Sequence, residues 1–282
     1  MRAFLWMTGA LVSFCLMAIG GRELAGGINT FQILLSRSVI GLLVVSAIIW
    51  KTGRPELFRT QRLKLQVGRN LFHFVGQYGW FLGLGLLPLA QVFALEFTTP
   101  LWTLLIAALF LKEKLSARKA VAIALGSIGV VLILNPGGDI VNPAALYVLG
   151  AAVCYALSYV ATKALSTTEA PLTILFYMCL VQLPLGLLLS ASHFVLPTPL
   201  QWVWLTLIGL SALSAHFCLT HAMKTAEVSV VVTLDFLRLP LIGVVGMALY
   251  GEGFKPMLLV GAALMLVGNL VNVYKPRGKA AG

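Results

Sequence analysis

The sequence predicts an all-α membrane protein of ten transmembrane helices, arranged as two five-helix repeats of inverted orientation. Three observations support this fold class. Hydrophobic residues fill 60% of the 282 positions and charged residues only 10%, whereas soluble domains carry about 25% charged residues. Long apolar runs follow one another along the whole chain. The second half of the chain also repeats the pattern of the first.

The apolar runs have the length that a bilayer requires. A hydrocarbon core about 30 Å thick is crossed by about 20 helical residues at ~1.5 Å each. Short turn-forming segments separate most runs, and the longer basic connection from Lys51 to Lys64 forms either a surface helix or a loop. The expected spans are Ala3–Gly21, Thr30–Trp50, Val67–Leu87, Leu89–Leu111, Ala120–Leu134, Leu146–Leu165, Leu172–Ser192, Leu200–Met223, Val228–Tyr250 and Met257–Tyr274.

The basic residues predict the orientation of these spans. A net charge of +11 would suggest nucleic acid in a soluble protein, but here the lysines and arginines cluster between apolar runs, so we expect no nucleic-acid partner. With an internal N-terminus, sixteen of them lie in inner segments and only Arg22 and Lys255 in outer ones. Both termini are therefore predicted to be cytoplasmic, in a bacterial-type inner membrane.

An internal repeat divides the chain. A shift of 139 positions aligns ALEFTTPLWTLLIAALFLKEKL, from Ala94, with TLDFLRLPLIGVVGMALYGEGF, from Thr233. Glu96 then matches Asp235, a charged residue within a span in both halves. We place the first repeat at residues 1–138 and the second at 139–282. Because each has five spans, an odd number, the second must enter the membrane from the opposite side.

The repeated segments also resemble a known family. AMKTAEVSVVVTLDF, LYGEGF and GAALMLVGNLV, with their counterparts LPLAQVFALEFTTPLW, LFLKEKL and AIALGSIGVVLI, are similar to the EamA repeat of the drug/metabolite transporter superfamily. The resemblance covers nearly the whole chain and occurs twice. It implies ten helices with both termini inside, and its nearest members are the YddG-type amino-acid exporters. It does not extend to the substrate.

These features together favour a secondary transporter that works by alternating access and exports amino acids or similar small amphiphiles. The alternatives are an importer of a metabolite, an intramembrane enzyme and a channel. The sequence contains no G-x-S-x-G, H-E-x-x-H or Walker motif, so we expect no enzyme, cofactor or metal site. A proton is a candidate coupling ion, and both a monomer and a homodimer stay open.

Glu96 and Asp235 are the strongest site candidates. Each lies about seven residues, hence about 10 Å, into its span. A charge at such depth costs about 2.5–3.5 kcal/mol even on the lenient insertion scale, so it should face a cavity or a partner. Either the two carboxylates bind a substrate ammonium or a proton, or they are structural. For Asp235 the structural alternative is an ion pair with Arg238, three residues on.

Prolines and a further arginine lie near these positions. Pro100 and Pro240 are predicted to kink their helices and to free the carbonyls of Glu96 and Phe236. Arg37, inside the second span, is expected to bind a carboxylate or to pair with Glu96 across the bundle, or else to snorkel to the headgroups.

Other polar and aromatic side chains within spans are candidates for the lining of a substrate path, or for interhelical hydrogen bonds and lipid contacts. They are His73, Gln77, Tyr78, Trp102, Tyr155, Tyr159 and His216.

The charge distribution generates a topology test. Single cysteines at Arg59, Lys114 and Lys279 should be shielded from an impermeant thiol reagent in intact cells, because these positions are expected inside. Cysteines at Asp139 and Lys255 should react. Labelling at Lys279 from outside would contradict the predicted orientation.

Overall fold

A computed structural model describes residues 2–110, 116–134, 142–225, 231, 234–253 and 255–273, and all regular elements in these ranges are helical. The first half contains α1 (Arg2–Leu24), α2 (Thr30–Lys51), the short 3-10 helix η1 (Pro55–Phe58), α3 (Leu63–Leu86), α4 (Leu89–Glu96), α5 (Thr99–Phe110) and α6 (Ala117–Leu134). The second half contains α7 (Ala144–Leu165), α8 (Pro171–Ser190), the short η2 (Ala191–His193), α9 (Pro199–Thr225), α11 (Arg238–Tyr250) and α12 (Pro256–Val273).

Seven described segments are long and apolar enough to cross a membrane, and α11 and α12 are shorter apolar helices. This confirms an all-helical multi-pass protein. Ten spans in an inverted repeat stay a prediction, and the predicted boundary between residues 138 and 139 lies outside the described residues. The seven segments are Phe4–Leu24, Thr30–Lys51, Leu89–Ile106, Ala117–Leu134, Ala144–Thr162, Pro171–His193 and Pro199–Leu219.

Local sequence sets several helix ends. The side chain of Asn29 caps α2 by accepting a hydrogen bond from the Phe31 N–H at 2.8 Å. Pro171 opens α8, where its missing N–H leaves no helical bond unmade. Gly251 ends α11 with φ of 62°, a left-handed conformation that glycine adopts without steric cost.

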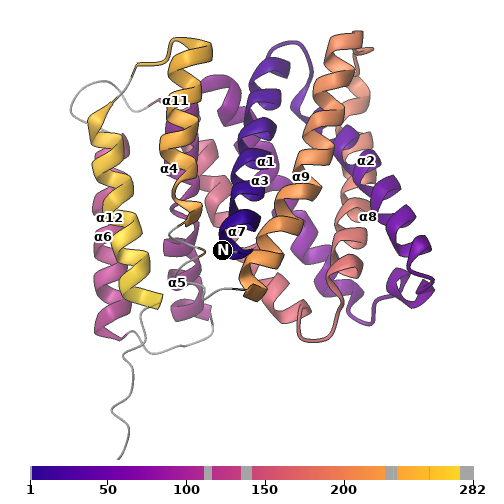
Figure 1. Ribbon diagram of the computed structural model, residues 1–282, viewed down its shortest axis with the longest axis horizontal. Coiled ribbons are helices and arrows are strands. Elements are labelled where there is room, and N and C mark those ends of the chain that lie inside the picture. The colour runs from indigo at the N-terminus through magenta and orange to yellow at the C-terminus, as the bar shows by residue number, and fades with distance from the viewer. Residues whose placement is uncertain are drawn as a thin grey trace, which may run out of the picture.

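The helices form one bundle, shown in Figure 1. The pair α6 and α12 lies at its left side, α4 and α11 come next, α1, α3, α7 and α9 fill the middle, and α2 and α8 lie at the right. The most extensive packing joins α1 to α9, α3 to α7, α6 to α12 and α2 to α8. Each of these pairs takes one helix from each half of the chain, so the interface between the halves runs through the whole bundle.

The bundle is apolar outside, and a set of polar side chains lies within its largely apolar interior. Large aliphatic side chains such as Leu43, Val131, Leu188 and Val244 are exposed on the helix surfaces. Lipid tails suit such a surface, whereas polar groups in a membrane protein must find partners inside the bundle. The buried interior holds Gln32, Arg37, Gln66, Arg69, Asn70, His73, Gln77, Gln182 and Arg238.

The apolar segment that begins at Leu89 consists of two helices, which corrects the prediction of a proline kink at Pro100 within one helix. α4 ends at Glu96 and α5 begins at Thr99, so Pro100 lies in the first turn of a new helix. The Glu96 carbonyl accepts a hydrogen bond from Thr99 Oγ1 at 2.6 Å. The threonine therefore replaces the bond that the proline cannot make.

The second half has a corresponding start. α11 begins at Arg238, 139 positions after α5, and Pro240 lies in its first turn rather than at a kink within a helix. The Phe236 carbonyl accepts a hydrogen bond from the Leu239 N–H at 3.1 Å. The carbonyl expected to be free is therefore bonded here as well.

Close packing of α3 on α7 generates a stability test. A Cβ at Gly79 would lie 2.5 Å from the Tyr147 carbonyl oxygen, whereas a Cβ at Gly68, on the same helix, would meet nothing within 4 Å. Gly79→Ala should destabilise the protein by about 1–3 kcal/mol, because backbone has to move. Gly68→Ala should be neutral or stabilising, since alanine favours helix. Unfolding in detergent, monitored by circular dichroism, measures both, and equal effects would contradict this packing.

Candidate functional site

Arg238 is the centre of the buried charges. Its side chain is 6% exposed, and its Nη2 donates a hydrogen bond to Asp235 Oδ2 at 2.7 Å. Its Nη1 lies 3.5 Å from Glu96 Oε1, at ion-pair distance. The structure therefore unites three predicted site residues, and it joins the two acids of the repeat through one guanidinium. We call these three residues the Arg238 cluster.

Aromatic rings surround the Arg238 cluster. The guanidinium carbon lies 4.3 Å from the ring centroid of Phe14 and 5.0 Å from that of Phe97, within cation–π range. Trp80 Nε1 donates a hydrogen bond to Glu96 Oε2 at 2.8 Å. Phe97 stacks on Phe236 with 4.3 Å between centroids, and these two residues occupy matching positions of the repeat.

Part of the cluster's bonding capacity is unused. Within the described part of the chain, Nε and Nη1 of Arg238 and Oδ1 of Asp235 are buried and have no hydrogen-bond partner. An unsatisfied buried polar atom costs about 1–3 kcal/mol, more when it is charged. With two carboxylates to one guanidinium, the ionised cluster also carries a net negative charge. It therefore offers both donors and an acceptor to a polar ligand.

A second polar group lies between α3 and α8. Gln77 Nε2 and Gln182 Nε2 lie 2.8 and 2.9 Å from His73 Nδ1. Because both amide groups are donors, we assign the ring proton of His73 to Nε2. His73 and Gln77 were predicted, and Gln182 was missed, although a lone amide inside the apolar run Leu172–Ser192 was a usable signal.

Ring contacts connect this group to the Arg238 cluster. The His73 ring centroid lies 5.6 Å from that of Tyr155 and 6.4 Å from that of His216. His216 in turn lies 6.3 Å from Phe14, the ring beneath Arg238. Tyr155 stacks on Tyr159 at 6.5 Å. The predicted residues His73, His216, Tyr155 and Tyr159 thus form a continuous aromatic wall.

Two further arginines are buried apart from the carboxylates. Arg37 is 8% exposed, and the expectation that it pairs with Glu96 is wrong, because Glu96 is engaged by Arg238 and Trp80. Arg69 is 6% exposed and donates to Thr162 Oγ1 and Asn70 Oδ1 at 3.0 and 2.6 Å. Arg69 falls inside the expected span Val67–Leu87, but it was not among the predicted site residues.

Two predicted residues are held elsewhere. Tyr78 stacks on Phe31 with 4.4 Å between ring centroids. Trp102 Nε1 donates to Thr98 Oγ1, one turn earlier in the chain, at 3.0 Å. The first contact packs α3 against α2, the second lies within one turn of the chain, and neither joins the residue to the aromatic wall.

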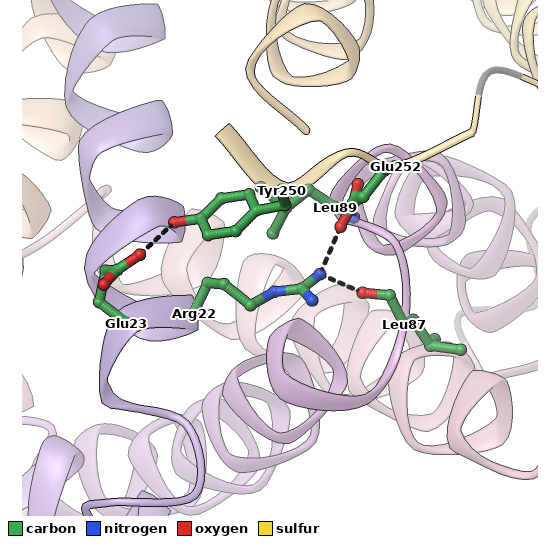
Figure 2. Close-up of polar contacts among 6 residues, drawn as sticks. All are labelled: Arg22, Glu23, Leu87, Leu89, Tyr250 and Glu252. Carbon is green, nitrogen blue, oxygen red and sulfur yellow. Dashed lines mark hydrogen bonds and ion pairs between the residues drawn. The ribbon is translucent and has the colours of Figure 1, made fainter. Parts of the chain in front are cut away.

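An ion pair joins the halves at one end of the bundle, the end where α1, α3 and α11 finish. Arg22 Nη2 lies 2.7 Å from Glu252 Oε1 and also donates to the Leu87 carbonyl. Glu252 Oε2 accepts a hydrogen bond from the Leu89 N–H at 2.9 Å, so it caps the start of α4. Figure 2 shows these contacts, with Tyr250 bonded to Glu23 beside them. We call this arrangement the latch.

A cavity of about 930 Å³ lies beside the latch, between α4, α11, α6 and α12. Glu252 and Lys255 line it at the end of the bundle, and Leu239 and Pro240 line its deeper part. These last two residues directly follow Arg238 in the chain. The cavity volume suits a cofactor-sized ligand, since ligand sites commonly enclose about 300–1,000 Å³.

Comparison with known proteins identifies transporters that match most of the chain. The sequence model of the EamA-like transporter family matches residues 1–135 and again residues 142–274. The chain is 24% identical to an S-adenosylmethionine uptake transporter of Rickettsia bellii, covering 96% of this chain and 93% of the relative. It is 29% identical to a riboflavin transporter of Vibrio cholerae, with 93% and 90% covered. A riboflavin transporter of Rhizobium johnstonii is 32% identical, with 80% and 79% covered.

A solved crystal structure matches with a TM-score of 0.66 and 20% identity, covering 96% of each chain. At this identity the likeness shows the fold alone.

The Arg238 cluster generates a second stability test. Arg238→Met should destabilise the protein by about 3–5 kcal/mol, because two buried carboxylates lose their counter-charge. Adding Glu96→Gln and Asp235→Asn should recover most of the loss, since no charge is then unpaired. Chemical unfolding in detergent measures both steps. The control is Arg54→Met, which removes an exposed ion pair with Glu56 and should change little. A triple variant as unstable as Arg238→Met would contradict the argument.

Proposed function

Because the chain belongs to the EamA-like transporter family, we propose that it imports a cofactor-sized metabolite that carries a heteroaromatic ring. Relatives that align over most of the chain are named for S-adenosylmethionine uptake and for riboflavin transport. Both compounds combine a planar ring system with a hydroxylated five-carbon unit derived from ribose. These relatives do not support amino-acid export, the activity expected from the YddG-type resemblance, and they favour the importer alternative.

The observation that carries this proposal is the combination of open polar atoms and aromatic faces around Arg238. A planar ring stacks favourably on aromatic side chains, and the Tyr155–Tyr159 stack offers such a surface on α7. Tyr159 is 48% exposed, so part of its side chain is open to contact. The unsatisfied atoms of Arg238 and Asp235 supply donors and an acceptor for the polar groups of the substrate.

The cavity beside the latch supports an entry route. In the predicted topology, the end where α1 and α11 finish faces outside, so a substrate would enter this cavity from outside and reach Leu239 and Pro240 at its deeper part. The latch between Arg22 and Glu252 joins the two halves at the same end. We infer that this ion pair breaks and forms as the halves rock against each other.

Helix interruptions support an alternating-access mechanism. The break after Glu96 and the start of α11 after Asp235 occupy corresponding positions in the two halves. Interrupted helices of this kind commonly form transporter sites near the membrane midplane. A substrate that binds the two acids and Arg238 would then shift the balance between outward-open and inward-open states through its differential affinity for them.

Uptake into proteoliposomes tests the proposal. Labelled S-adenosylmethionine or riboflavin should enter saturably with the wild-type protein. Glu96→Gln should lower that uptake by about 10- to 100-fold, the effect of losing a charged hydrogen bond of about 1.5–3 kcal/mol. Glu56→Gln, in an exposed pair outside the bundle core, is the matched control and should leave uptake unchanged.

Other results would replace the proposal. Saturable export of amino acids from preloaded vesicles, without uptake of either compound, would favour the exporter. Fluxes that do not saturate and show no counterflow would favour a channel.

A further inference from the structure

Arg37 is a buried cation without a counter-ion in the described structure. It lies about 10 Å along α2 from the helix start, and it is 8% exposed. No described residue forms a hydrogen bond or ion pair with it, whereas Arg22 and Arg238 each pair with carboxylates. An uncompensated charge in the interior of a membrane bundle is costly, and such residues commonly mark a substrate or ion pathway.

The acidic residues are already engaged. Six of the nine lie in the described ranges, and each accepts a hydrogen bond from a group other than Arg37. The donors are Tyr250 for Glu23, Arg54 for Glu56, Trp80 for Glu96, Thr60 for Glu169, Arg238 for Asp235 and Arg22 for Glu252. None of these six residues therefore supplies a carboxylate to Arg37.

A small cavity adjoins the guanidinium. It lies between α2, α8 and α9, and its volume of about 10 Å³ is room for one water molecule. Gln182 and Cys179 line it on one side, and Gly209 and Ala212 on the other. Gln182 belongs to the His73 group, so the cavity adjoins the aromatic wall. A slight separation of α2 from α8 and α9 would admit a larger group beside Arg37.

A second cation strengthens the positive potential. Arg69 interacts electrostatically with Arg37 and is bonded to the neutral residues Thr162 and Asn70. Tyr155, in the aromatic wall, lies within electrostatic range of both Arg37 and Glu96. The interior thus presents two regions of opposite charge joined by one aromatic wall.

We propose that Arg37, reinforced by Arg69, binds an anionic group of the transported molecule, a carboxylate or a phosphate. A guanidinium binds either group through two parallel hydrogen bonds. The Arg238 cluster, with its net negative charge, would receive a cationic or ring-bearing part of the same molecule. This inference rests on the proposed uptake function and narrows its substrate to molecules that carry an anionic group.

Ligand pairs that differ by one anionic group test the proposal by equilibrium binding to the purified full-length protein. One pair is S-adenosylmethionine and its decarboxylated form, and the other is riboflavin 5′-phosphate and riboflavin. In at least one pair, the anionic member should bind the wild type about 10- to 100-fold more tightly, the range for hydrogen bonds between charged groups.

Variants at Arg37 test whether this residue causes the preference for the anionic ligand. Arg37→Met should abolish the preference by weakening only the anionic member, and Arg37→Lys should retain part of it. Arg54→Met, which changes an exposed arginine directly before η1, should leave the preference for the anionic ligand unchanged. The ligand-free Arg37→Met protein should also melt about 2–4 °C higher than the wild type, because an uncompensated buried charge is gone.

The outcomes separate this inference from the uptake function. Uptake of riboflavin alone, with equal binding within each pair, would overturn the anion site and leave the importer intact. If Arg37→Met weakens the binding of both pair members equally, the arginine has a structural role, and the proposed anion site is overturned.

If neither pair binds, the uptake proposal fails, and the melting temperature becomes the test of the anion site. Stabilisation by inorganic phosphate of the wild type but not of Arg37→Met would then support it, and a lower melting temperature for Arg37→Met would overturn it.

Discussion

The guanidinium of Arg238 lies inside a bundle whose outer surface is apolar, and the site is organised around compensating its charge. Removing an ion from water costs several kcal/mol, which only close counter-charges offset. Two carboxylates reach it because each belongs to a segment that is interrupted beside the acid: α4 ends at Glu96, and α11 begins three residues after Asp235. The stack of Phe97 on Phe236 packs the two interruptions together.

The other two buried arginines are not compensated by carboxylates in the described structure. Arg37 and Arg69 are buried as deeply as Arg238, but among described residues they have no carboxylate partner. The rings of His73, His216 and Phe14 connect the two regions in steps of 4.3 to 6.4 Å. A molecule that spans these regions would meet negative charge at one end and positive charge at the other. Under the proposed function, this charge arrangement would select substrates whose charges have a particular sign and spacing, whereas the packing of the bundle does not depend on the substrate.

Substrate choice is accordingly separable from fold. Relatives aligned over most of this chain are named for S-adenosylmethionine and for riboflavin, two compounds with different charges. The features that identify the family are apolar periodicity, glycines and helix ends, which determine packing between helices. A few interior side chains decide what the site binds. For this reason a resemblance that correctly indicated the EamA family pointed to amino-acid export, which the relatives do not support.

The sequence by itself determined what depends on local patterns: the helical membrane class and the positions of most helices within a few residues. Helix periodicity and bilayer thickness suffice for these conclusions. Only the tertiary structure decided which distant groups meet, because pairing across the bundle depends on how helices of the two halves pack. In the tertiary structure, Glu96 contacts Arg238 and Trp80 instead of Arg37. The tertiary structure also revealed Gln182 beside His73, 109 positions away in the chain. No spacing within a single helix encodes such contacts, since they arise where two helix surfaces face each other in the packed bundle.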